Sequence, residues 1–198
     1  MTARCHGYRV IAGLAAVFLL GVGQIRAAQE PPVAAEDAVR GFVARVEAYT
    51  WLHERLEGPL PPIETTADPL SRLMNRRYLA SAIRAARRYA KPGDILTPDV
   101  ADVLRTRLAE GLAAAETAAL IGSLGDGSAT ASAIVNEPFR EEESCGVPPR
   151  LLEQLPPLPG DIQYRILGSS LVLWDVHADI VIDVLPDAFR ALSPVSSR

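Results

Sequence analysis

The sequence predicts an α+β protein in which an N-terminal part of about four helices packs against a C-terminal three-stranded antiparallel meander. Three observations support this prediction. Apolar residues recur every three or four positions through the first half of the chain, which is the helical period. Three short β-rich runs separated by turn residues come near the C-terminus. A chain of 198 residues with 48% hydrophobic residues can build one shared core.

The first 27 residues have the pattern of an export signal. Arg4 and Arg9 precede an apolar run over 10–23, which is too short for a comfortable membrane span of about 20 residues. Small residues then allow cleavage after Ala27 or after Ala28. An uncleaved N-terminal anchor is the alternative. The pattern predicts a periplasmic or extracellular protein with no transmembrane segment after cleavage.

Charge and cysteine content limit the classes of function. Cleavage removes three arginines and leaves 17 basic against 24 acidic residues, a formal net charge of −7. Nucleic-acid binding requires a basic surface, so no nucleic-acid partner is predicted. Cys145 is then the one remaining cysteine, and it follows three glutamates, 141–143, that oppose thiolate formation. It is expected to be an inert thiol or to pair between molecules.

The helical region is assigned to residues 28–125. The first helix spans 34–57 and ends at Gly58-Pro59. Its apolar stripe comprises Val39, Phe42, Val46, Tyr49, Leu52 and Leu56. The second helix starts at Asp68-Pro69, a capping residue followed by a proline suited to the first turn, and ends at Lys91-Pro92-Gly93. Its apolar positions are Leu70, Leu73, Met74, Tyr78, Leu79, Ile83, Ala86 and Ala90.

The third helix starts at Thr97-Pro98-Asp99 and bends or breaks at Gly111. Its inward residues are Val100, Val103, Leu104 and Leu108. An alanine-rich helix then continues to Leu124. Residues 126–160 are interpreted as a loop or linker with a short helix within 148–155, because Ser, Gly, Pro and acidic residues dominate there.

The meander is assigned to residues 161–198, with strands over 162–167, 171–175 and 180–185. Two-residue turns at Gly168-Ser169 and His177-Ala178 set the register, so that Leu167 faces Ser170 and Val176 faces Asp179. Three cross-strand rows then form an apolar face toward the helices: Tyr164–Leu173–Ile182, Ile166–Leu171–Val184 and Ile162–Asp175–Ile180. The opposite face carries Gln163, Arg165, Val172, Trp174, Val181 and Asp183, with Arg165 and Asp183 as a surface charge pair.

Three strings in the chain resemble those of a group of small exported bacterial proteins of unknown function. They are Tyr49-x-x-Leu52-His53-x-x-Leu56-Glu57-x-x-Leu60-Pro61-Pro62, then Gly93-Asp94-Ile95 with Thr97-Pro98, and the tail Tyr164-Arg165 … Leu173-x-Asp175 … Ile182-Asp183. The resemblance implies export and brings no activity. The tail is also similar to hairpins of several small periplasmic proteins, some of which handle nickel and cobalt.

Two groups of residues could ligate a metal. Asp175, His177 and Asp179 alternate around the predicted second turn and could direct oxygen and imidazole ligands at zinc or nickel. The alternative is a turn in which these residues bond their own backbone. His53 and Glu57, four apart on one helix face, could form a base or a ligand pair, or a half-buried structural pair.

Two surfaces could bind a partner. Arg77, Arg84, Arg88 and Lys91 line one face of the second helix and could hold an acidic envelope component or a protein carboxylate patch. The alternative is a solvated face. Trp174 with its apolar neighbours on the outer sheet face could form a second contact patch, unless the 126–160 segment covers it.

The function predicted from these residues is non-catalytic binding outside the cytoplasm. Nucleophile elbows, phosphate loops and dinucleotide fingerprints are missing from the sequence, and no cofactor is predicted. One alternative is a metal-binding or metal-dependent envelope protein that uses Asp175, His177 and Asp179. The other is a structural oligomer, linked in one version through Cys145. The ligand and the oligomeric state stay open.

Overall fold

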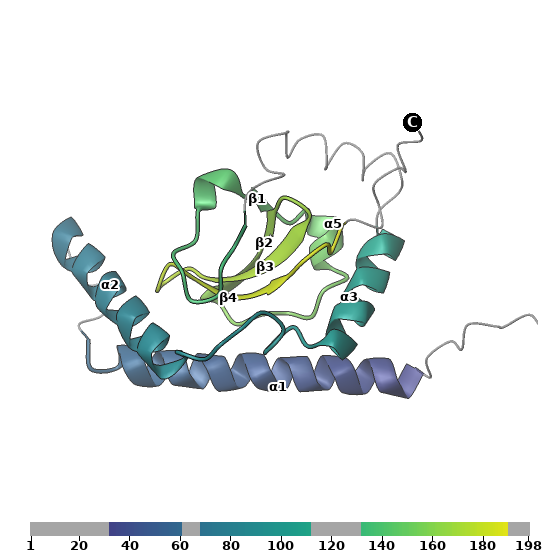
Figure 1. The fold of residues 1–198 in the computed structure, drawn as a ribbon, viewed down its shortest axis with the longest axis horizontal. Coiled ribbons are helices and arrows are strands. Elements are labelled where there is room, and N and C mark those ends of the chain that lie inside the picture. The colour runs from purple at the N-terminus through teal and green to yellow at the C-terminus, as the bar shows by residue number, and fades with distance from the viewer. Residues whose placement is uncertain (1–31, 61–67, 112–131, 190–198) are drawn as a thin grey trace, which may run out of the picture.

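The structure is a computed structural model that describes residues 32–60, 68–111 and 132–189 (Figure 1). The predicted export signal and the predicted helix at 112–124 lie outside these residues, so the structure bears on neither. None of the described helices is long and apolar enough to cross a membrane. The described part is α+β, as predicted, with N-terminal helices packed against a C-terminal antiparallel sheet.

Helix α1 (Pro32–Glu57) forms the base of the molecule and runs beneath the sheet (Figure 1). Its predicted stripe faces the core: Phe42, Val46 and Tyr49 are buried, and Val39, Leu52 and Leu56 are half-buried. The helix ends at Glu57, as predicted, where Gly58 and Pro59 follow. The apolar period therefore decided both the length and the buried face of this helix.

Helix α2 (Pro69–Ala86) differs from the prediction in its end and in its exposed face. The Asp68 carboxylate caps it as expected, accepting from the Ser71 backbone N–H at 2.9 Å. The regular helix stops before Arg87, whose carbonyl oxygen accepts a hydrogen bond from Asn136 Nδ2. Five of the predicted apolar positions of this helix are exposed: Leu70, Leu73, Met74, Tyr78 and Ala86. The N-terminal half of α2 extends away from α1 and the sheet (Figure 1), so no described residue covers it.

Helix α3 (Pro98–Gly111) packs on α1 and reaches the short helix α5 (Pro149–Leu152). All four of its predicted inward residues are buried, namely Val100, Val103, Leu104 and Leu108. A turn of 3₁₀ helix, η2 (Glu141–Glu143), precedes the strands. One apolar cluster joins α1, α2 and α3 to α5 and the inner face of the sheet, so the helices and the sheet share a core.

The sheet has four strands rather than the predicted three, in the order β1-β2-β3-β4. They are β1 (Cys145–Gly146), β2 (Ile162–Leu167), β3 (Ser170–Asp175) and β4 (Ile180–Leu185). The extra strand β1 is only two residues long, too short for an alternation pattern to reveal it. The predicted pairings Leu167↔Ser170 and Asp175↔Ile180 are confirmed.

A β-bulge between β3 and β4 makes two of the predicted rows wrong. Leu173 pairs with Asp183 rather than Ile182, and Leu171 pairs with Leu185 rather than Val184. One extra residue in a strand transfers each residue beyond it to the other face. Asp183 therefore leaves the outer face, where it was expected beside Arg165, and lies fully buried on the helix side.

The outer face of the sheet is covered, so the predicted contact patch around Trp174 is instead a second apolar cluster. Val135 and Phe139 pack on Val172, Trp174 and Val181. The segment that covers this face, residues 135–139, is also hydrogen-bonded to the edge of β4. The Asn136 N–H donates to the Val181 carbonyl at 2.8 Å, and the Val181 N–H donates to the Glu137 carbonyl at 2.9 Å. The linker region thereby protects both a face and an edge.

The loop between α2 and α3 depends on a glycine. Gly93 has φ +88° and donates its N–H to Asp183 Oδ1 at 2.9 Å. Gly93→Ala should lower the free energy of unfolding by about 1–2 kcal/mol, because a Cβ strains the left-handed conformation. Urea denaturation of this variant and of Gly160→Ala tests it. At Gly160 an added Cβ meets nothing within 4 Å, so that control should be neutral. Equal losses in both variants would contradict the explanation.

Candidate metal centre

The candidate site lies where the end of α1 meets the turn between β3 and β4. His53 and Glu57 are one helical turn apart on α1, so their side chains share a face. His177 belongs to the β3–β4 turn, and its Nδ1 lies 3.3 Å from Glu57 Oε1. The shared core that docks α1 on the sheet therefore joins two segments that are far apart in the sequence.

Asp175, the last residue of β3, holds the centre of the site. It is fully buried, and its Oδ2 accepts two hydrogen bonds from α1: one from the Tyr49 hydroxyl at 2.5 Å and one from His53 Nδ1 at 2.7 Å. Its Oδ1 accepts the Ala178 backbone N–H at 2.8 Å. Because a carboxylate oxygen accepts here, Nδ1 of His53 carries a hydrogen. The neutral ring then has its free lone pair on Nε2.

The free nitrogens of the two histidines face the same carboxylate. His53 Nε2 lies 3.3 Å from Glu57 Oε2, yet neither Nε2 nor His177 Nδ1 makes a hydrogen bond with any described residue, and both atoms are buried. The two imidazole rings stack with centroids 5.9 Å apart. Buried polar atoms are normally hydrogen-bonded, so two such atoms at one place suggest a missing ligand.

The three side chains have the spacing of a ligand set. One donor atom from each of His53, Glu57 and His177 lies within 4.8 Å of the others. Zinc bonds of roughly 2.0–2.1 Å place tetrahedral ligands about 3.3 Å apart, so small side-chain movements would close the set on an ion. The His53 side chain is 4% exposed, against 26% for Glu57 and 22% for His177. The site therefore opens to solvent on the side of Glu57 and His177.

The electrostatics of the site favour a cation. Burial lowers the pKa of His53, but the hydrogen bond to Asp175 and the charges of Asp175, Glu57 and Asp161 outweigh it, and the net pKa is raised. The pKa of Tyr49 is also raised, first by burial and then by the charge of Asp175 and the hydrogen bond to it. Tyr49 therefore remains a protonated donor, and the carboxylates make the surroundings of His53 attractive to positive charge.

The residues predicted to converge around the turn separate in the structure. His177 is one of the three residues whose donor atoms lie together. Asp175 is not; it accepts hydrogen bonds from Tyr49 and from His53, and His53 is one of the three. Asp179 has φ +55° and its Oδ1 accepts from Trp174 Nε1 at 3.2 Å. Trp174 belongs to the outer apolar cluster, so the Asp179 carboxylate faces the other side of the sheet. Burial raises the pKa of Asp179 there.

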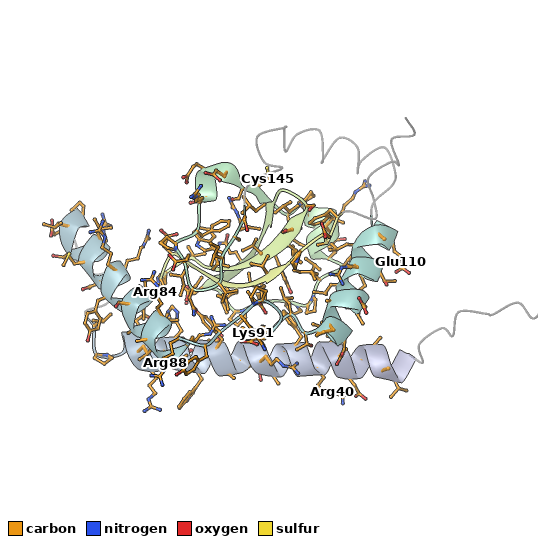
Figure 2. All side chains as sticks on the ribbon, viewed as in Figure 1. Arg40, Arg84, Arg88, Lys91, Glu110 and Cys145 are labelled. Atoms are coloured by element: carbon orange, nitrogen blue, oxygen red, sulfur yellow. The ribbon has the colours of Figure 1, made fainter. Side chains whose placement is uncertain are left out.

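Two of the predicted partner-binding residues, Arg84 and Trp174, have contacts within the fold. Arg77, Arg88 and Lys91 are exposed, but Arg84 is half-buried and its Nε donates to the Asn136 carbonyl at 2.9 Å (Figure 2 labels Arg84, Arg88 and Lys91 near the end of α2). Trp174 is only 5% exposed beneath Phe139.

Cys145 has no part in the candidate centre. It pairs with Ile166 near the end of β2 that is remote from the site, whereas Ile162 at the other end of β2 pairs with Asp175. Figure 2 shows Cys145 on the edge of the sheet away from α1. The thiol is half-buried and free, and it is too distant to act with His53 as a nucleophile and its base.

Sequence reasoning missed three contributors to the site. Tyr49 was assigned only to the apolar stripe, and Asp161 and Arg87 were given no role. The Arg87 guanidinium lies 5.0 Å from the Tyr49 ring centroid, and its NH2 donates to the Ile182 carbonyl at 3.0 Å. A signal existed for Tyr49: with His53 and Glu57 it follows an i, i+4, i+8 spacing on one helix face.

Comparisons with models of known families, with curated proteins and with solved structures found no match. The resemblance noted in the sequence stays a prediction. Four residues of the site, Tyr49, His53, Glu57 and Asp175, belong to the strings that carry that resemblance.

Proposed function

We propose that this protein binds one divalent transition-metal ion through His53 Nε2, the Glu57 carboxylate and His177 Nδ1. The observation that carries the proposal is the pair of buried imidazole nitrogens that face one carboxylate and make no hydrogen bond within the described part of the chain. Desolvating such an atom without a partner costs about 1–3 kcal/mol. A metal ion would satisfy both at once.

The donor set indicates the class of metal. Imidazole suits zinc, nickel, copper and cobalt, and two histidines with one glutamate are a known zinc ligand set. Asp175 supports this assignment, because a histidine ligand commonly donates its other ring N–H to a carboxylate, which orients the ring and makes it a better ligand. Zinc is therefore the first ion to test.

The alternative use of the same residues is general-base catalysis by the His53–Asp175 pair. A base must reach a proton on a substrate or a water. Nε2 of His53 instead points toward Glu57 and His177, whose side chains lie between it and solvent in the arrangement described here. Metal binding explains why two histidine nitrogens face the same carboxylate, whereas base catalysis gives a role to His53 alone.

Calorimetric titration of the metal-stripped protein with zinc tests the proposal. We expect one ion per chain in the wild type, and His177→Ala should weaken binding at least about 100-fold because it removes a ligand. Asp179→Asn is the matched control: it lies in the same turn, but its carboxylate accepts from Trp174 on the other side of the sheet. The control should bind zinc as the wild type does.

Two results would count against the proposal. Absence of zinc, nickel, copper and cobalt binding by the wild type would overturn it. Loss of binding in Asp179→Asn equal to that in His177→Ala would instead favour the Asp175/His177/Asp179 set. Mass spectrometry of the metal-loaded protein provides an independent count of bound ions.

The wider setting of this binding function is also a proposal. An exported protein, periplasmic or extracellular, would meet metal ions outside the cytoplasm, and the charge and apolar pattern of residues 1–27 supports export. Binding of an acidic envelope component by Arg77, Arg84, Arg88 and Lys91 stays a prediction. The bond from Arg84 to Asn136 gives that arginine a role within the fold.

A further inference from the structure

We propose that Asp161 supplies the fourth ligand of the metal centre, so that the protein holds its ion in a closed shell of two histidines and two carboxylates. This inference rests on the proposed metal binding. It extends that proposal by assigning the centre to metal holding rather than to metal-dependent catalysis.

The backbone of Asp161 is fixed beside the site. Its carbonyl oxygen accepts the Val176 N–H at 2.9 Å, and Val176 immediately precedes the ligand His177. The next residue begins β2, and the Ile162 N–H donates to the Pro159 carbonyl at 3.0 Å, which fixes the preceding turn. The Cα of Asp161 is therefore held at a constant place relative to the β3–β4 turn.

The side chain of Asp161, in contrast, is able to move toward the ion. It is 58% exposed, and its Oδ1 lies 3.9 Å from His177 Nδ1, which is too long for a hydrogen bond. Rotation about its side-chain bonds changes this distance without moving the backbone. A carboxylate on a fixed backbone, next to a donor nitrogen that lacks a hydrogen bond, is well placed to become a ligand.

Asp161 lies beside His177, on the side of the centre that is open to solvent. His53 closes the inner side of the centre, and Glu57 and His177 are partly exposed on the outer side. Zinc in holding sites takes four protein ligands in a tetrahedral arrangement, whereas catalytic sites keep the fourth place for water. A second carboxylate would fill that place and would also neutralise the ion together with Glu57.

The test compares the wild type with Asp161→Asn and Asp161→Ala, using zinc affinity measured against a competing chelator and the visible spectrum of the cobalt(II)-loaded protein. Loss of a ligand should weaken zinc binding at least about tenfold in both variants. Azide should change the cobalt spectrum of Asp161→Ala, whose fourth position is open, and leave that of the wild type unchanged. Glu153→Gln, an exposed carboxylate on α5's C-terminal side, is the matched control and should behave as the wild type.

The outcomes separate this inference from the proposed function. If the wild type binds none of the four metals, both are overturned. If the wild type binds zinc, His177→Ala does not, and both Asp161 variants bind as tightly as the wild type, only the fourth ligand is overturned. Entry of azide into the cobalt-loaded wild type would likewise show an open position and would overturn the closed shell. Melting temperatures measured without metal confirm that the variants are folded.

Discussion

Asp183→Ala is expected to lower the free energy of unfolding by about 3–5 kcal/mol. The Asp183 carboxylate is fully buried and accepts three backbone N–H groups from the loop between α2 and α3: those of Gly93, Ile95 and Leu96, at 2.9, 2.7 and 2.8 Å. Its Oδ1 also accepts the Val184 N–H at 2.8 Å. Removing the acceptor leaves these donors without a partner in a place that water reaches poorly.

The measurement is urea denaturation followed by circular dichroism. Asp102→Ala is the control, because it removes an exposed carboxylate that is paired with Arg105 on α3 and should cost about 1 kcal/mol or less. Asp183→Asn keeps one carbonyl acceptor, so its loss of unfolding free energy should lie between those of Asp183→Ala and Asp102→Ala. Similar losses for Asp183→Ala and Asp102→Ala would show that Asp183 does not hold the loop to the sheet.

Asp175→Asn is expected to weaken zinc binding about 10–100-fold and to lower the free energy of unfolding by about 3 kcal/mol. Both donors from α1, the Tyr49 hydroxyl and His53 Nδ1, reach the same oxygen, Oδ2, while Oδ1 accepts the Ala178 N–H. An asparagine has one oxygen and one NH₂ group. With its oxygen toward α1, its NH₂ group faces the Ala178 N–H; with its NH₂ group toward α1, that group faces the His53 Nδ1–H, and the bond that orients His53 is lost.

Tyr49→Phe separates the structural part of this effect from the metal-binding part. It removes one donor from Oδ2 but leaves the His53–Asp175 bond, so we expect a loss of about 1 kcal/mol in stability and zinc affinity close to that of the wild type. Zinc affinity in Asp175→Asn equal to that of the wild type would contradict the orienting role.

The helical elements show what could be predicted from local pattern. The stripe of α1 and the inward residues of α3 repeat at the helical period, and Asp68-Pro69 marks the start of α2 through a local hydrogen bond. The same pattern failed for Leu70 and Met74, which are exposed. Amphipathic spacing shows which side of a helix is apolar, but it does not show whether another element of the structure covers that side.

The register of the sheet could be predicted only in part from the sequence. Turn residues and alternation predicted the strands, the pairings between β2 and β3 and the pair Asp175↔Ile180, but the bulge between Leu173 and Trp174 has no sequence pattern in this chain. Because side chains alternate with a period of two, one extra residue was enough to move Asp183 from the surface to the core. A buried charge is hard to predict from its own position when its partners are backbone groups of a distant loop.

The candidate site was predicted as two separate groups. His53 with Glu57 and the turn around His177 were each weighed alone, and for each a structural role was the alternative considered. In the structure the first group supplies two of the three donor residues and the turn supplies one, and 122 residues separate His53 from Asp175. The two groups meet because α1 docks on the inner face of the sheet. The three- and four-residue period predicts that the apolar side of α1 makes this contact, but it does not predict which turn of the helix lies beside the β3–β4 turn.

The sequence by itself determined the fold class, the end of α1, the start of α3, the three long strands and the candidate ligand types, because these follow from periodicity, capping and turn chemistry within a few residues. The tertiary structure alone decided the bulge, the burial of Asp183 and Trp174 and the meeting of His53, Glu57 and His177. Those features depend on which groups must be desolvated and paired when distant segments pack together, and that pairing exists only once the core has formed.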